Sequence, residues 1–217
     1  MFVLPNDLNK AIEDMEKSVL NSLDSDNSRL IIEFKFEGIK FNRISFKLFN
    51  LLANKNNNVY LTYSDPGAVA LAQRDYKEIK DKIFTFKSFT NSPHISESNS
   101  ILISMLPQPY DFDSFEPMCE NFLGKHISIN PKFEDANIGI GTVIRERRKN
   151  FVKTWTNIYF IQPLNNGALM HIAPSNWALF KEKDNKYYFV KDFDSKPDNE
   201  TIFICLLYTS DAADDKC

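Results

Sequence analysis

Three turns of the chain carry residue types that bind small ligands in open α/β proteins. Asp65 and Gly67 lie where a predicted strand ends and a helix begins, while Asn130 and Pro107 follow two other predicted strands. In such proteins the ligand lies beyond the carboxyl ends of the strands, where helix amides can face an anion. We therefore predict that Asp65, Gly67 and Asn130 line one ligand cleft. The alternative is that Asp65 caps its helix and no ligand is bound.

Gly139 and Gly141 form a second candidate ligand site, in the sequence Ile138-Gly-Ile-Gly-Thr142. A phosphate-binding P-loop requires a Lys-Ser/Thr pair after its last glycine. The dinucleotide fingerprint requires a third small residue, where this chain has Ile144. The pair is therefore interpreted first as a tight turn into the following helix and second as a ligand-binding loop.

A basic cluster follows these glycines. Arg145, Arg148 and Lys149 share one face of the predicted helix because their spacing is three and four residues. This face is predicted to bind an acidic partner, a phosphate or anionic lipid headgroups. The alternative is a solvated basic face without a partner. Arg147 falls on another face, with Ile144 and Phe151, and is expected to point toward the sheet.

Trp177 is the remaining candidate for partner binding. It follows Pro174-Ser-Asn176, where a later group of strands begins. Aromatic side chains anchor many protein interfaces, so Trp177 is predicted to lie on an exposed docking patch. A place in the core is the alternative.

Groups suited to catalysis or metal binding are scattered. His94, His126 and His171 occur singly, without the spacing of metal ligands. Cys119 lies in an apolar helical stretch and is expected to be a small core residue. We predict no catalytic residue, metal or cofactor, and enzymatic activity is left undecided, with a non-enzymatic role favoured.

Residues 205–217 resemble a translated sequencing adapter and are expected to lie outside the native domain, with a natural acidic tail as the alternative. The whole chain has 26 basic and 29 acidic residues. Removing one Lys and three Asp with the tail leaves a charge near −1, which argues against nucleic-acid binding. The longest apolar run, at 101–106, is too short to span a bilayer. Without a recognisable leader, a cytoplasmic protein is predicted.

Hydrophobic periodicity predicts an α/β fold for a single domain at 1–204. A Rossmann-like open, mostly parallel sheet with helices on both faces is expected over about 1–153, followed by an antiparallel β-meander over about 154–204. Predicted helices cover 8–23, 44–51, 67–76, 112–123 and 141–151. Predicted strands cover 30–34, 59–63, 83–86, 101–106, 127–129, 155–163, 168–173, 177–181 and 187–193.

Several motifs together resemble the DUF1995 family of cyanobacteria and plastids. They are Leu4-Pro5, Arg29-Leu-Ile-Ile-Glu33, Tyr63-Ser-Asp-Pro-Gly-Ala-Val-Ala-Leu-Ala-Gln-Arg-Asp75, Ile129-Asn-Pro-Lys-Phe-Glu-Asp135, Ile138-Gly-Ile-Gly141, Arg145 to Phe151, Tyr159-Phe-Ile-Gln-Pro-Leu-Asn-Asn-Gly-Ala-Leu169 and Pro174-Ser-Asn-Trp177. Each motif is short, and their order and spacing carry the resemblance.

The resemblance implies a biological setting rather than a reaction. Plant members include a chloroplast factor named for low photosystem II accumulation, and a related domain is attached to a chloroplast adenylate kinase. The resemblance thus implies a non-enzymatic assembly or regulatory factor whose partners belong to the photosynthetic assembly machinery. It implies a cyanobacterial protein, in the cytoplasm or at the thylakoid surface. The alternatives are a nucleotide- or phosphate-binding domain and a peripheral membrane adaptor.

Overall fold

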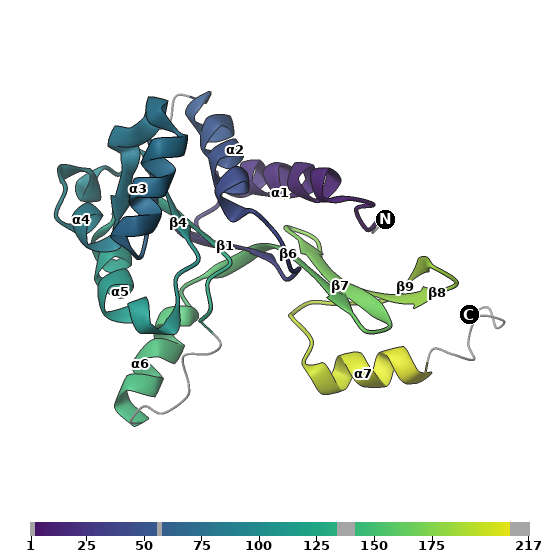
Figure 1. Ribbon diagram of the computed structural model, residues 1–217. Coiled ribbons are helices and arrows are strands. Elements are labelled where there is room, and N and C mark those ends of the chain that lie inside the picture. Colours follow the sequence, from purple (N-terminus) through teal and green to yellow (C-terminus); the bar gives the residue numbers. More distant parts are fainter. Residues whose placement is uncertain (1–2, 56–57, 134–141, 209–217) are drawn as a thin grey trace. The chain divides into compact units, whose positions relative to one another are not determined.

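The computed structural model describes residues 3–55, 58–133 and 142–208. The chain forms two compact units (Figure 1). The first, here called the parallel unit, comprises Ser22–Glu33 and Gly38–Asn157. The second, the meander unit, comprises Met1–Asn21, Phe34–Glu37 and Ile158–Cys217.

The strands of the parallel unit form the predicted parallel sheet. Their order is β3-β2-β4-β5-β1, and each strand pairs in parallel with its neighbours. Their side chains are buried almost without interruption, as is typical of a parallel sheet covered on both faces. The bounds are β1 Arg29–Phe34, β2 Asn58–Tyr63, β3 Ile83–Thr85, β4 Ser100–Met105 and β5 Lys125–Ile129.

Helices cover both faces of this sheet, as predicted. On one face, Tyr60 and Leu102 pack with Phe86 of α4 and Phe115 of α5. Leu61 alternates with Tyr60 and is fully buried on the other face, where right-handed crossovers place α2 and α3. The helices are α2 Phe41–Ala53, α3 Pro66–Asp75, α4 Phe86–Thr90, α5 Phe112–Asn121 and α6 Thr142–Val152, with 3-10 turns η1 Lys77–Lys82, η2 Pro93–Ser96 and η3 Pro109–Asp111.

The meander unit contains the predicted antiparallel strands, in the order β6-β7-β8-β9. Asp184 and Asn185 connect the last two strands with positive φ angles of 53° and 57°. Such a two-residue turn matches the twist of the strands that it joins. The elements are α1 Leu8–Ser22, β6 Thr156–Leu164, β7 Gly167–Ile172, β8 Trp177–Lys183, β9 Lys186–Phe193 and α7 Asn199–Tyr208.

Helix α7 was not predicted from the sequence. Ile202 packs against Phe160 and Leu169, on the face of the meander that α7 covers (Figure 1). Ala168, Met170 and Phe180 alternate with these residues and form a second cluster on the opposite face. The helix continues past residue 204, where the native domain was expected to end, and the adapter-like origin of 205–217 stays a prediction.

Candidate functional site

The carboxyl edge of the parallel sheet has a topological switch point between β2 and β4. From β2 the chain passes through α3 to β3 on one side, whereas from β4 it passes through α5 to β5 on the other. Open α/β sheets bind ligands in the crevice where neighbouring connections diverge in this way. The turn that contains Asp65 and the turn that begins at Leu106 meet at this point.

Asp65 caps helix α3. Its Oδ1 atom accepts a hydrogen bond from the amide of Ala68 at 2.9 Å, and Pro66 occupies the first helical turn. A Cβ atom on Gly67 would lie 2.9 Å from the same carboxylate oxygen, so glycine leaves room for the cap. Asp65 therefore caps the helix, and ligand binding at Asp65 and Gly67 stays a prediction.

The next two strands end in strained turns. Leu106 and Asn130 have φ angles of 50° and 48°, which non-glycine residues rarely adopt outside functional or tightly constrained sites. The amide of Leu106 donates to the carbonyl of Ile129 at 2.9 Å, and the amide of Lys132 donates to Pro107 at 2.9 Å. The turns after β4 and β5 thus lie side by side, as predicted for Pro107 and Asn130.

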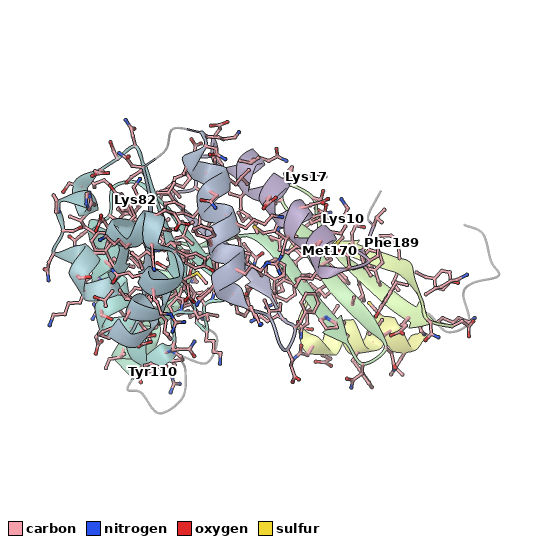
Figure 2. The ribbon with its side chains drawn as sticks, turned by 45° about the horizontal axis from the view of Figure 1, so that its top comes forward. Lys10, Lys17, Lys82, Tyr110, Met170 and Phe189 are labelled. Carbon is pink, nitrogen blue, oxygen red and sulfur yellow. The ribbon has the colours of Figure 1, made fainter. Side chains whose placement is uncertain are left out.

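Asp111 adds a second carboxylate to the switch point. Burial raises its pKa, and the negative charge of Asp65 raises it further, while hydrogen bonds from the Gln108 amide and Ser64 oppose these effects. The Gln108 amide donates to Asp111 Oδ2 at 2.8 Å. The neighbouring Tyr110 is 81% exposed (Figure 2). Two adjacent carboxylates make this edge unfavourable for a phosphate and favourable for a hydroxyl, amide or cationic group.

A hollow of about 480 Å³ lies beside α3, at the end of β3. Val69, Gln73 and Phe84 are among its lining residues, whereas Asp65, Gly67 and Asn130 are not. Gly139 and Gly141 fall outside the described residues. Of the predicted ligand residues, Asp65, Gly67 and Asn130 thus lie at one edge of the sheet.

The basic residues of α6 do not form a single exposed face. Arg145 and Lys149 are exposed, but the Arg148 guanidinium lies 4.7 Å from the ring centroid of Phe112 and is half-buried. Arg147 was expected to point toward the sheet. Instead, its guanidinium forms an ion pair with Glu116 of α5. Only Arg145 and Lys149 remain as exposed members of the predicted anion-binding set.

The prediction that Trp177 lies on an exposed patch is wrong. Its side chain is 6% exposed and stacks on His171, with ring centroids 4.7 Å apart and an interplanar angle of 8°. It also packs against Phe160 at 5.0 Å. Trp177 is the first residue of β8, and strand alternation turns it toward the core beneath α7.

A buried polar chain crosses three strands of the parallel unit and was missed in the sequence. Thr62 Oγ1 lies 2.8 Å from Ser104 Oγ, which lies 2.6 Å from His126 Nε2. Burial, aided by the charge of Arg29, lowers the pKa of His126 to about 3, so its ring is neutral at pH 7. Polar residues within otherwise apolar strands were the available signal.

A family model for a domain of unknown function, DUF1995, matches residues 5–203. The chain belongs to the DUF1995 family. No curated protein matches the chain. The match covers both units of the DUF1995 chain and ends within α7.

The DUF1995 chain also exposes a run of aromatic residues on β9. Tyr187, Tyr188 and Phe189 are 46, 52 and 48% exposed (Figure 2 labels Phe189). Successive residues of a strand point to opposite faces, and all three of these side chains are exposed. Both faces of β9 are therefore exposed in this segment. Within 3–55, 58–133 and 142–208, no helix is long and apolar enough to cross a membrane. In the same ranges, no group of three His, Cys, Asp or Glu side chains is arranged to hold a metal ion.

Proposed function

We propose that this DUF1995 protein is a non-enzymatic assembly or regulatory factor of the photosynthetic apparatus that acts through protein–protein contacts. The biological setting follows the resemblance to plant members of the family, among them the factor named for low photosystem II accumulation. The structural observation that supports protein binding is the aromatic run Tyr187, Tyr188 and Phe189 on β9.

Exposed aromatic side chains are unusual on a surface that contacts only water. Tyr and Phe bring a large apolar area to an interface and lose little conformational entropy when they are fixed there. Three in succession expose apolar surface on both sides of one strand. Exposed aromatic side chains of this kind are characteristic of a protein-binding surface.

The test is affinity purification from a photosynthetic host, with the full chain as bait. We expect recovery of photosystem subunits or their assembly proteins, and loss of these proteins with Tyr187→Ser, Tyr188→Ser and Phe189→Ser combined. Tyr110→Ser is the matched control because Tyr110 is 81% exposed and belongs to the other unit. Recovery of no photosynthetic protein by the unmodified bait would exclude the proposal.

A nucleotide- or phosphate-binding function has weaker support. Leu106 and Asn130 hold strained turns at the switch point, which favours a ligand there. However, the carboxylate of Asp65 already accepts from the Ala68 amide of α3, and Asp111 lies close enough for its pKa to be raised by Asp65. A phosphate would meet two negative charges. Thermal unfolding with ATP or inorganic phosphate checks this alternative, and stabilisation that Asp65→Asn alters would favour it.

A peripheral membrane function would use Arg145 and Lys149. Both are exposed on α6, next to Ile144, which is 49% exposed. Such a small basic patch gives weak binding that depends strongly on salt. Sedimentation with phosphatidylglycerol vesicles, compared between the protein and Arg145→Glu/Lys149→Glu, tests this function.

A further inference from the structure

Strand β9 forms one end of the strand order of the meander unit. It pairs with β8 on one side, from Trp177↔Phe193 to Lys183↔Lys186. The outer edge of a terminal strand presents backbone groups that can pair with another extended segment. The exposed aromatic run lies on this strand, so the edge offers both backbone pairing and apolar contact.

Four lysines lie on one face of the β8–β9 hairpin, and one of them, Lys181, donates a hydrogen bond to the Leu206 carbonyl of α7 at 2.7 Å. Lys186 lies opposite Lys183, and Lys191 lies opposite Leu179. Residues directly opposite in an antiparallel pair share a face, as do residues two or four apart along one strand. Leu179 and Lys183 are four apart, so Lys183, Lys186 and Lys191 point to the same side.

An irregularity in β9 produces this arrangement. The pairing steps from Leu179↔Lys191 to Phe180↔Phe189, which leaves Val190 as an extra residue in a β-bulge. Without the bulge, Lys186 and Lys191 would point to opposite faces, because they are an odd number of residues apart. The bulge therefore places a positive charge on the same face at both ends of the aromatic run.

The acidic residues of the two strands point the other way. Glu182 lies opposite Tyr187 and forms a side-chain hydrogen bond with it. Asp192 lies opposite Ala178 and accepts a hydrogen bond from Asn176 at 2.9 Å. The lysine face therefore keeps its positive charge, which is complementary to an acidic segment.

We propose that the edge of β9 binds an extended acidic segment of a partner protein as an additional strand. This inference rests on the proposed protein-binding function and specifies its partner. Backbone pairing along Lys186–Phe189 supplies affinity, Tyr188 supplies apolar contact, and Lys183, Lys186 and Lys191 select carboxylates on the lysine face. An anionic membrane would satisfy the lysines but would not require an extended peptide backbone.

The test uses a short fluorescent peptide of alternating glutamate and valine and the full chain, measured by fluorescence anisotropy. We expect binding that weakens with added salt and that falls on the order of tenfold in Lys183→Glu/Lys186→Glu/Lys191→Glu. A lysine–valine peptide should not bind, and prolines inserted in the acidic peptide should abolish binding because they remove backbone donors. Amide exchange in β9 should slow when the acidic peptide is added.

The outcomes separate this inference from the function on which it depends. No binding of the acidic peptide, equal binding by the charge-reversed variant, or equal binding of the proline-containing peptide overturns strand addition. Salt-sensitive binding to phosphatidylglycerol–phosphatidylcholine vesicles without peptide binding overturns it in favour of a membrane. If recovery of photosynthetic proteins still depends on Tyr187–Phe189 while the peptide fails, only the strand-addition inference is lost.

Discussion

Arg147 on α6 forms an ion pair with Glu116 on α5, whose side chain is only 3% exposed. The Arg147 side chain is 60% exposed, so a surface residue compensates a buried charge. Its Nε atom lies 3.1 Å from Glu116 Oε1. This pair fixes α6 to α5, so Arg147 bonds to α5 instead of pointing toward the sheet as the sequence suggested.

Replacing Arg147 with Ala is expected to destabilise the protein by about 1–3 kcal/mol, because the Glu116 carboxylate stays buried without its cation. Chemical denaturation measures the change. Lys149→Ala, on the same helix and exposed, should change stability by less than about 0.5 kcal/mol. Glu116→Gln in the Arg147→Ala background should recover part of the loss, and strict additivity of the two changes would show that the residues do not interact.

The cap of α3 gives a second prediction. Asp65→Ala removes the acceptor for the Ala68 amide and should cost about 1 kcal/mol, whereas Asp65→Asn should retain most of the stability. Gly67→Ala should also destabilise, because the new Cβ would crowd the capping carboxylate. Thermal unfolding of the three variants provides the measurement. An unchanged melting temperature for Asp65→Ala would contradict the capping role.

The electrostatic coupling of Asp65 and Asp111 can be measured directly. Since the charge of Asp65 raises the pKa of Asp111, Asp65→Asn should lower that pKa toward its ordinary value. Carbon-detected NMR titration of the Asp111 carboxyl group follows the shift. Asp113→Asn is the control, because Asp113 is exposed and lies on α5, and it should leave the Asp111 titration nearly unchanged. An equal effect of both substitutions would exclude a specific contact.

The sequence predicted most of the layered fold because its signals are local. Apolar strands such as 101–106 alternate with amphipathic helices, and the turn at Asp184 and Asn185 has the residue types that a hairpin requires. The parallel order and the meander followed from these elements. Short elements were missed: α4 begins at Phe86, inside a predicted strand, and the capping box of Thr85 and Ser88 that starts it was not recognised.

The candidate site was predictable from the sequence only where the interacting residues lie close together along the chain. The cap at Asp65 spans three residues, so its residue types suffice. The Arg147–Glu116 pair joins residues 31 apart, and the Thr62–Ser104–His126 chain joins three strands. Trp177 was misplaced for a related reason: its burial depends on α7, which the sequence did not predict.

The burial of Trp177 predicts a large loss of stability on truncation. Trp177→Ala removes a side chain that packs against His171 and Phe160 and leaves a cavity beneath α7, so we expect about 3–5 kcal/mol of destabilisation. Trp177→Phe should cost less because it preserves part of the packing. Guanidinium denaturation measures both. A loss below about 0.5 kcal/mol for Trp177→Ala would match an exposed residue and contradict the structure.

His126 predicts a pH dependence of stability with a definite sign. Its pKa is lowered from 6.5 to about 3 in the folded protein, chiefly by burial. Below pH 6.5 the unfolded chain therefore binds a proton that the folded chain does not. Protonation then favours unfolding, and His126 lowers stability by about 1.4 kcal/mol per pH unit as the pH falls from about 6 toward 3. Above the unfolded pKa this contribution disappears.

Other groups titrate in the same range, so the test compares the protein with His126→Gln. Asp111, whose pKa is raised, acts in the opposite direction, because its folded form binds a proton more readily. It is present in both proteins and cancels in the difference. Urea unfolding at pH 6.0 and 4.5 should show that the unmodified protein loses about 2 kcal/mol more than the variant over this interval. Equal losses would mean that His126 is protonated in the folded state, which its burial and the charge of Arg29 oppose.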